Sequence, residues 1–227
     1  MMMGVAIMDE KGLVAEYRFE ATRSRSERLM PMIDRVLKDS QTTPENLAGI
    51  AISIGPGSFT GLRIGVSTAK GLAFALKLPV VRISTLEVLA ASLSSEPLAC
   101  WPGRAYLICP VLDAKRQEVY SALFRADSGG GLKKIIEEEA ITPAGLIEKL
   151  SGLHEPILFM GTGTLLYEAM IREKLAELAM FGSRLDPYPS PSMVAQLGMK
   201  RLKNSGGDDP SSLAPLYLSR FQAKMGL

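Results

Sequence analysis

The stretch Gly55–Gly65 reads GPGSFTGLRIG and decides how the rest of the chain is interpreted. It follows the apolar run LAGIAISI, which predicts a buried strand over residues 47–54, and it opens a segment of helical character that continues to about residue 77. Glycine is a poor helix former, so glycines this dense at the start of a helix need a physical reason. Two reasons are open: phosphate binding at the helix N-terminus, or close packing of another backbone against the helix.

The spacing of these glycines does not favour a phosphate-binding loop. In a P-loop, four residues separate the first glycine from Gly-Lys-Ser or Gly-Lys-Thr, and no glycine of this stretch is followed by that pattern. Pro56 also removes one N–H donor from the loop. A dinucleotide-binding fingerprint fits only loosely, as Gly55-x-Gly57-x-x-x-Gly61, and no acidic residue ends the next predicted strand, residues 79–83.

Small residues recur at every fourth position along the predicted helix, and this favours close packing. The stripe consists of Gly57, Gly61, Gly65, Ala69 and Ala73. Relative to alanine, glycines at positions 61, 65 and 71 cost about 3 kcal/mol together, which a gain in packing must offset. A second stripe, Leu62, Val66, Ala69 and Leu76, is available to the chain's own sheet. The pattern leaves open whether the neighbour on the small stripe is a helix of the same lobe or a partner protein.

Composition indicates a protein with a sizeable core and no strong charge. The 227 residues are 47% hydrophobic and carry a formal net charge of +2, too little to argue for nucleic-acid binding by itself. The two cysteines, Cys100 and Cys109, lack metal-type spacing and are typical of reduced thiols. No apolar run is as long as a membrane span, and residues 1–12 lack the pattern of a secretion signal. We therefore expect a cytoplasmic protein.

Strand and helix patterns occur twice in similar order along the chain. In the first half we expect strands at residues 4–8, 13–19, 47–54 and 79–83, and helices at 26–39, 58–77 and 85–95. In the second half we expect strands at 104–112, 118–125, 132–139 and 156–160, and helices at 143–150, 165–179 and 192–203. This predicts two α/β lobes related by duplication, residues 1–97 and 104–227, with the boundary near residues 97–103.

Several segments together resemble one protein family. Residues 53–90, SIGPGSFTGLRIGVSTAKGLAFALKLPVVRISTLEVLA, resemble the most recognisable segment of the TsaB family, also called YeaZ. The resemblance continues in SERLMPMIDRVL before that segment, and in VLDAKRQEVYSALF, FMGTGTLLYEAM, PSPSMVAQLGMKRL and LAPLYLSRF after it. It covers nearly the whole chain in the right order.

This resemblance implies a two-lobed acetate-kinase/Hsp70/actin-like fold (ASKHA, ribonuclease H-like) and a role without cofactors in tRNA modification. Its members help to place a threonylcarbamoyl group on the adenosine beside the anticodon of tRNA. They act as the non-catalytic partner of the catalytic subunit TsaD, and the ATPase TsaE joins the assembly. The resemblance implies that tRNA is reached through the complex, and that the protein alone forms a homodimer through the same surface. The implied pairing residues are Met30, Ile33, Leu37, Gly57, Gly61, Arg63, Gly65, Ala69 and Ala73.

The residues present disfavour peptidase activity. That activity has been assigned to proteins of this family because they are similar to TsaD. The chain has one histidine, His154, so a histidine metal site cannot be built, and no G-x-S-x-G nucleophile motif is present. The alternative from another class is an actin-like small-molecule kinase that uses ATP and Mg²⁺. Its candidate nucleotide-binding residues are Asp113, after an apolar strand, and Gly161 and Gly163, at a strand-to-helix junction; a turn or a simple connection explains them as well.

The chain departs from the family pattern at its beginning. Family members normally open with a strand about a dozen residues before the position matched by Gly4. We therefore expect the N-terminal lobe to lack its first strand, either through a truncated start or genuinely. Such a sheet has a gap, and the unpaired backbone groups at the gap must find partners or remain costly.

Overall fold

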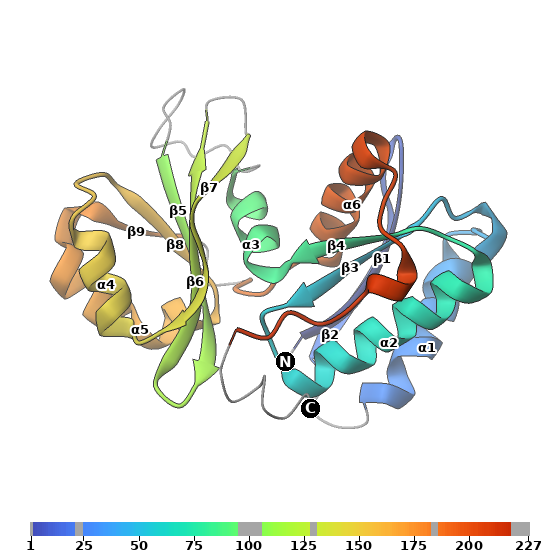
Figure 1. Cartoon of the computed structure of the whole chain (residues 1–227), viewed down its shortest axis with the longest axis horizontal. Coiled ribbons are helices and arrows are strands. Elements are labelled where there is room, and N and C mark those ends of the chain that lie inside the picture. Colours follow the sequence, from blue (N-terminus) through green and yellow to red (C-terminus); the bar gives the residue numbers. More distant parts are fainter. Residues whose placement is uncertain (1, 21–24, 95–105, 128–130, 183–185, 219–227) are drawn as a thin grey trace. The chain divides into compact units, whose positions relative to one another are not determined.

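The computed structural model describes residues 2–20, 25–94, 106–127, 131–182 and 186–218. The chain forms two compact units, Met1–Val88 with Pro189–Leu216, and Leu89–Tyr188 with Tyr217–Leu227 (Figure 1). This division differs from the predicted lobes 1–97 and 104–227. A late helix, residues 191–205, packs against strands of the first unit, so the chain returns to that unit after forming most of the second. The predicted boundary at residues 97–103 lies outside the described residues.

The described residues of the first unit form two strand pairs, three complete α-helices and the first turn of a fourth. The strands are β1 (Met2–Asp9), β2 (Gly12–Glu20), β3 (Ile50–Gly55) and β4 (Val80–Ser84), and the helices are α1 (Arg25–Asp39), α2 (Phe59–Leu76), α6 (Pro191–Ser205) and the first turn of α3 (Thr85–Ser94). All of these elements were predicted from the sequence to within about three residues at each end. The Asp9 carboxylate fixes the first hairpin, because its Oδ1 accepts hydrogen bonds from the backbone N–H groups of Lys11 and Gly12 at 2.7 and 3.1 Å.

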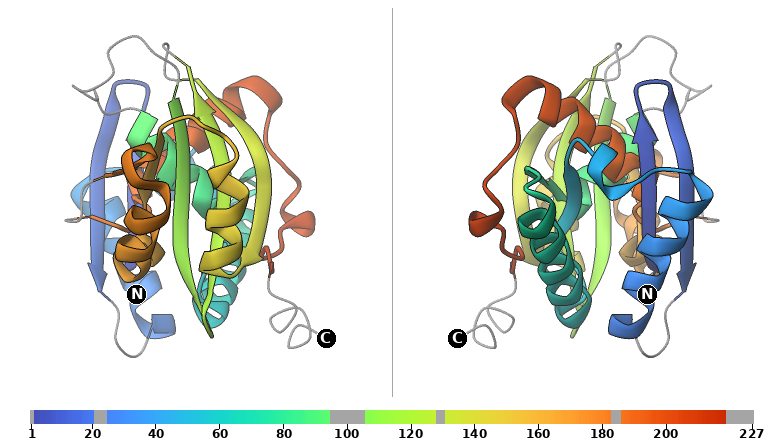
Figure 2. Two further views of the ribbon diagram at one scale, coloured as in Figure 1. Left: turned by 90° about the vertical axis from the view of Figure 1, so that its left-hand side faces the viewer. Right: turned by 90° about the vertical axis from the view of Figure 1, so that its right-hand side faces the viewer.

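The strands of the first unit do not form one continuous sheet. β1 pairs with β2 in antiparallel fashion, β3 pairs with β4 in parallel, and no ladder joins the two pairs among the described residues. Helix α6 contacts both β1 and β3, while α1 packs on the hairpin and α2 on β3. Figure 2 shows the β1–β2 hairpin as a separate two-stranded ribbon beside α6. The interruption predicted for this lobe therefore lies between β1 and β3.

The second unit has a continuous five-stranded sheet in the order β7-β6-β5-β8-β9. Its elements are β5 (Tyr106–Lys115), β6 (Glu118–Ala126), β7 (Leu132–Ile141), α4 (Pro143–Ser151), β8 (Ile157–Met160), α5 (Thr162–Leu175) and β9 (Ala179–Phe181). β5 is central, antiparallel to β6 and parallel to β8. β9 was not predicted, because the helical pattern of α5 extends in the sequence through residue 179. A short 3₁₀ turn, Ala176–Leu178, ends the helix and lets the edge strand form.

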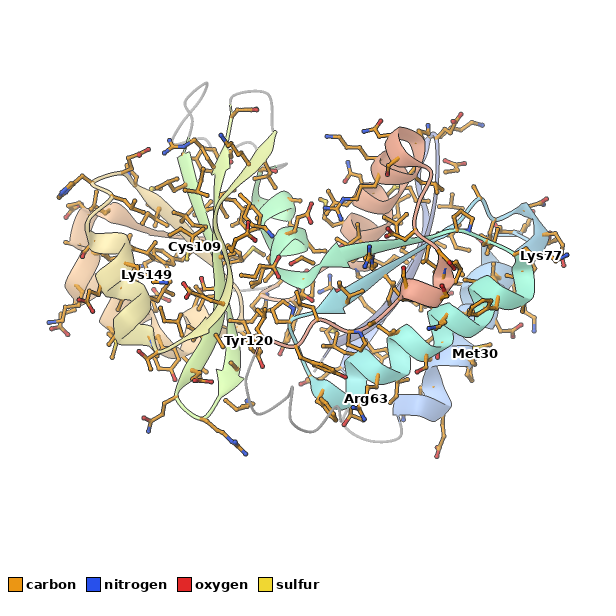
Figure 3. The ribbon with its side chains drawn as sticks, viewed as in Figure 1. Met30, Arg63, Lys77, Cys109, Tyr120 and Lys149 are labelled. Carbon is orange, nitrogen blue, oxygen red and sulfur yellow. The ribbon has the colours of Figure 1, made fainter. Side chains whose placement is uncertain are left out.

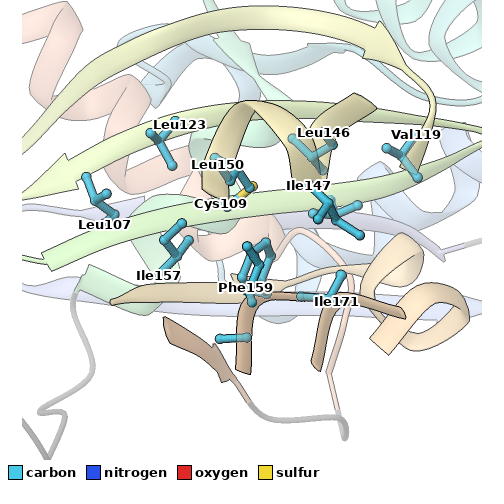
Figure 4. Close-up of a cluster of buried hydrophobic side chains, with 13 residues drawn as sticks. Leu107, Cys109, Val119, Leu123, Leu146, Ile147, Leu150, Ile157, Phe159 and Ile171 are labelled. Carbon is cyan, nitrogen blue, oxygen red and sulfur yellow. The ribbon is translucent and has the colours of Figure 1, made fainter. Parts of the chain in front are cut away.

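A cluster of buried apolar side chains from β5, β6, β8, β9, α4 and α5 forms the core of the second unit (Figure 4). Cys109 lies in it and is fully buried, with its Sγ 3.2 Å from the Ser121 hydroxyl. Burial raises the pKa of the Cys109 thiol to about 12, so this cysteine stays protonated and inert at neutral pH. Cys100 lies outside the described residues.

Candidate partner-binding surface

The glycine stretch begins with a residue that the chain's own packing requires. Gly55 ends β3 with a φ of +123°, a value that side-chain-bearing residues rarely adopt. A Cβ at this position would lie 2.8 Å from the carbonyl oxygen of Leu216, in the segment that hydrogen-bonds to Ile54. Ser58 then caps α2, accepting a hydrogen bond from the Gly61 backbone N–H at 3.4 Å. The junction is thus a tight internal turn that starts a capped helix.

One face of α2 is buried against the unit's own strands. Val66, Ala69 and Ala73 are 5%, 6% and 0% exposed and belong to a core cluster with Val80 and Leu213. Ala69 and Ala73 were predicted to contact a partner. The structure corrects that prediction: both lie beneath β3 and β4, so they are part of the fold and offer no free surface.

Other glycines of α2 are not required by internal packing. A Cβ at Gly65 would make an ordinary contact, 3.5 Å from Cδ1 of Ile52, and a Cβ at Gly71 would meet nothing within 4 Å. Just before the helix, a Cβ at Gly57 would lie 3.9 Å from the nearest atom, on Leu62. Each glycine inside the helix costs about 1 kcal/mol relative to alanine. Neither the backbone angles nor the core of this chain explains why glycine is kept at positions 65 and 71.

The exposed face of α2 is offset from the predicted stripe. Its exposed positions include Arg63, Ser67, Gly71, Phe74 and Ala75, which follow one another at helical spacing. Phe74 is 55% exposed, a large apolar ring on the surface. The Arg63 guanidinium lies 4.0 Å from the centroid of the Phe59 ring. Figure 3 shows Arg63 near the start of α2 and Lys77 at its end.

Helix α1 lies beside α2 and adds a second apolar row. Met30 is 48% exposed, and Ile33 and Leu37 are half-buried one and two turns further along. Val36 is 1% exposed and is the helix's buried anchor. At the C-terminal end, Asp39 bonds the Tyr17 hydroxyl of β2 and the Arg35 Nε, and both interactions lower the pKa of the Asp39 carboxyl.

The predicted pairing residues therefore separate into three groups. Met30 and Arg63 are exposed, Ile33, Leu37, Gly57, Gly61 and Gly65 are half-buried, and Ala69 and Ala73 are buried. Sequence reasoning missed Phe74 and did not assign Gly71 to the surface. The signal was present, because Val66 faces the sheet and a helix brings positions three and seven residues later, 69 and 73, to the same face. We call α1 and α2 with Met30, Ile33, Arg63, Gly71 and Phe74 the α1–α2 surface.

The structure brings the three nucleotide-site candidates of the second unit together, but packing explains them. Gly161 has a φ of +120°, and a Cβ there would overlap the carbonyl oxygen of Val111. A Cβ at Gly163 would lie 3.0 Å from the carbonyl carbon of Leu112. Both glycines therefore let the start of α5 approach β5 closely.

Asp113 is engaged by its own neighbours. Its backbone N–H donates to Thr162 Oγ1 at 3.2 Å, and its Oδ1 accepts from the Lys115 N–H at 2.8 Å. The Lys115 ammonium lies 2.5 Å from Asp113 Oδ2, and this contact raises the pKa of Lys115. The carboxylate is thus engaged by the backbone N–H and the ammonium group of Lys115, two residues further along the chain.

The cavity next to Gly161 is small. It is lined by residues of β8 and α5, among them Thr164 and Glu168, and has room for about one water molecule. Thr164 is 4% exposed and its Oγ1 has no hydrogen-bond partner, so a single water is the occupant that fits. A purine ring would not fit in this space.

Within the parts of the chain that the structure describes, no cluster of three or more histidine, cysteine or acidic residues is arranged to hold a metal ion. His154 is exposed on the turn after α4, with a φ of +50°. Over the same residues, no helix combines the length and apolar character needed to cross a bilayer.

Comparison with known proteins identifies close relatives. A family model described as TsaD, tRNA N6-adenosine threonylcarbamoyltransferase, matches residues 16–227. The tRNA threonylcarbamoyladenosine biosynthesis protein TsaB of Bacillus subtilis (strain 168) is 34% identical over 224 residues, covering 98% of this chain and 91% of the relative.

Two solved structures from Pseudomonas aeruginosa share the fold. One is an uncharacterized protein with similarity to peptidase YeaZ, at a TM-score of 0.80 and 24% identity. The other is YeaZ, at a TM-score of 0.77 and 25% identity. Each match covers 96% of this chain and 94% of the solved one. Together with the family model, these matches confirm the predicted two-lobed actin-like fold.

Proposed function

The chain belongs to the TsaB (YeaZ) family, and we propose that it serves tRNA threonylcarbamoyladenosine biosynthesis as a non-catalytic subunit that pairs with the catalytic subunit TsaD. In this proposal the α1–α2 surface is where the partner binds. The partner's backbone approaches closely along the side of α2 where glycine leaves the helix backbone uncovered.

One observation carries the choice of surface. Gly65 and Gly71 cost helix stability, yet a Cβ at Gly71 would meet nothing within 4 Å, and one at Gly65 would make only an ordinary contact, 3.5 Å from Cδ1 of Ile52. Met30 and Phe74 place two large apolar side chains on the same pair of helices, 48% and 55% exposed. Small residues flanked by exposed apolar ones are typical of a surface that another protein covers.

The remaining parts of the assembly follow from family membership. We infer that TsaE joins the complex, that tRNA is reached through the complex, and that the α1–α2 surface pairs two copies of this chain when TsaD is absent. Since its tRNA substrate is cytoplasmic, we place the protein in the cytoplasm.

A non-catalytic role is supported by the residues themselves. The one histidine of the chain is exposed on a turn, where it has no described partner with which to form a catalytic pair. The kinase alternative needs an acidic side chain free to face a metal-bound phosphate, whereas Asp113 is ion-paired with Lys115. The small cavity beside Gly161 adds no support for a nucleotide site.

The proposal is tested by titrating purified TsaD into the chain and into its Gly71→Leu variant, using calorimetry and a sizing column. Leucine at position 71 points into open space in the isolated chain and replaces glycine by a good helix former, so the fold should be retained or slightly stabilised. In the complex it would hold the two backbones apart, and we expect affinity for TsaD to fall at least 100-fold.

A matched control adds the same side chain elsewhere. Glu148→Leu places leucine on an exposed position of α4, in the second unit, and should leave the affinity for TsaD unchanged. Wild-type affinity of the Gly71→Leu variant would contradict the α1–α2 surface as the pairing site. If neither chain binds TsaD or supports threonylcarbamoyladenosine formation in a TsaB-deficient extract, the function itself is wrong.

A further inference from the structure

Helix α1 contains a proline well inside its length. The helix spans Arg25–Asp39, and Pro31 lies beyond the first turn, where proline is tolerated. Proline has no backbone N–H, and its ring crowds the carbonyl group four residues earlier. The carbonyl of Glu27 therefore lacks the hydrogen bond that it would accept from residue 31 in a regular helix, although the helix continues to Asp39.

Packing of the ring inside the chain does not account for this proline. Its side chain is exposed and fills no space in the core, and Glu27 and Met30 beside it are exposed as well. The buried anchor of the helix is Val36, which is 1% exposed and lies on the side opposite Glu27. Because proline disfavours a helix interior even more strongly than glycine, Pro31, like Gly71, lowers helix stability at an exposed position.

The charged side chains of α1 single out the same turn. In the part of the chain that the structure describes, the Glu27 carboxylate has no ion pair or hydrogen bond. Its place in the first turn suits the helix dipole, which explains the sign of its charge but provides no partner. The other charged side chains of residues 27–39 all have one: Arg28 over the Phe19 ring at 5.4 Å, Lys38 with Asp34 at 2.7 Å, and Arg35 with Asp39 at 2.6 Å.

Two acceptors of one residue therefore lie on the outer face of α1 without a donor. The Glu27 carbonyl points along the helix toward the ring of Pro31, one turn further on. Since the Glu27 side chain is exposed and unpaired, it is free to turn toward a donor bound at its own carbonyl. Met30, which is 48% exposed and belongs to the α1–α2 surface, lies within the same turn. The acceptors thus border the surface that the proposed partner covers.

We propose that Glu27 is a specificity-determining residue of the α1–α2 surface, where its carboxylate and the carbonyl freed by Pro31 together bind one basic side chain of TsaD. This inference rests on the proposed function and gives the chemistry of one of its contacts. An arginine suits the two acceptors better than a lysine, because a planar guanidinium carries several N–H donors in a fixed arrangement. Such a contact selects a partner whose positive charge lies at one defined place, which apolar side chains alone do not select.

A purely structural role for Pro31 predicts a different result. Proline bends a helix, and a bend that fits α1 to the hairpin would serve the fold alone. Replacing Pro31 would then lower the stability of the isolated chain. Under our proposal alanine restores the missing helix hydrogen bond, so the isolated chain gains stability while its binding to TsaD weakens.

The test measures the melting temperature of the full chain and, by calorimetry, its affinity for purified TsaD. We expect Pro31→Ala to raise the melting temperature by about 2 °C or more and to weaken binding about tenfold. Glu27→Gln should weaken binding about tenfold at low salt and less at high salt, because salt screens a surface charge. In the Pro31→Ala chain, Glu27→Gln should weaken binding further by less than about twofold, because both substitutions remove the same contact.

Asp34→Asn is the matched control. Asp34 lies on the same side of α1 as Glu27, seven residues further along, but Lys38 already pairs with it at 2.7 Å. Its removal should change the affinity for TsaD by less than about twofold.

The outcomes separate this inference from the proposed function. Wild-type affinity of Pro31→Ala, a lower melting temperature of that variant, or losses that simply multiply in the double variant would each overturn the shared contact. If the unmodified chain binds TsaD and Gly71→Leu does not, the α1–α2 surface stands even where the shared contact is overturned. If the unmodified chain does not bind TsaD, both proposals are overturned.

Discussion

The two units use similar helices to cover their strands, and yet they bury those strands to different degrees. In the second unit, the central strands lie in a continuous five-stranded ladder and their side chains are almost wholly inaccessible. In the first, the ladder is interrupted between β1 and β3, and both strands at the interruption are only half-buried. The difference indicates that helices covering both faces of a strand do not bury it fully where the ladder beside it is interrupted.

The same contrast appears in how apolar residues gather. Among the described residues, the second unit includes an extended cluster around Phe159, Cys109 and Ile157. The described residues of the first unit include two smaller clusters, one between α2 and β3 and one between β4 and α6. Since hydrophobic stabilisation scales with the apolar area removed from water, at about 25 cal/mol per Å², we expect the second unit to hold most of the chain's stability.

The largest expected effect comes from removing a core ring of the second unit. Phe159→Ala should lower the free energy of unfolding of that unit by about 4 kcal/mol, because it leaves a cavity among fully buried neighbours. Ile52→Ala in β3 should lower that of the first unit by less than about 2 kcal/mol, because Ile52 is half-exposed and the site can relax. Hydrogen exchange measured in increasing denaturant, on peptides from each unit, reports both values.

Equal losses for the two variants would contradict the comparison, since they would mean that β3 is packed as tightly as β8. Leu165→Ala provides a control in the second unit. This side chain is 45% exposed on α5, so its loss should cost far less than that of Phe159.

Sequence patterns predicted most of the fold because each element carries its own periodicity. The patterns that predicted a strand at residues 4–8 and helices at 58–77 and 143–150 are local signals, and the structure confirms these elements to within about two residues at each end. Two features were not local. The return of α6 to the first unit depends on tertiary contacts such as Gly198 against Ala51, and β9 exists because it can pair with β8.

The candidate site was predicted less well than the fold. A stripe of small residues identifies a helix face that permits close packing, but it does not show whether the neighbour is internal. Ala69 and Ala73 serve the chain's own core, whereas Gly71 and Phe74 lie outside it. The distinction depends on how α2 is rotated against β3, which small residues specify poorly because they fit either environment.

A smaller effect distinguishes two glycines with nearly the same backbone angle, one in each unit. Gly12 has a φ of +129°, and a Cβ added there would meet nothing within 4 Å, whereas Gly161 has a φ of +120° and lies against the Val111 carbonyl. Gly12→Ala should cost about 1 kcal/mol, from backbone strain alone. Gly161→Ala adds steric overlap to this strain, and we expect it to lower the free energy of unfolding by about 3 kcal/mol in all. Thermal unfolding of both variants measures the difference. Similar costs would show that β5 yields easily at this point, contrary to a rigid second unit.

The smallest effect concerns two matched ion pairs, one in each unit. Arg82 forms two bonds of 3.0 Å to Asp208 in the first, and Arg125 forms bonds of 2.7 and 2.9 Å to Glu155 in the second. Hydrogen bonds from arginine hold the pKa of each carboxyl below its usual value. A lowered folded-state pKa contributes stability that is present above the unfolded-state pKa, about 4 for both groups, and is lost as the pH falls further.

Solvent screens both pairs, since their side chains are 35–43% exposed, so each contributes under about 1 kcal/mol. Unfolding free energies measured between pH 6 and pH 3 should therefore decrease modestly in both units, and Arg82→Gln should flatten the decrease only in the first. Arg125→Gln should do the same only in the second. An unchanged pH dependence in either variant would show that the arginine does not lower the pKa of its carboxylate. The two pairs match in geometry and exposure. A much larger effect of one substitution on the pH dependence of unfolding would therefore have to come from the residues around that pair. The interrupted sheet of the first unit predicts that Arg82→Gln has the smaller effect of the two.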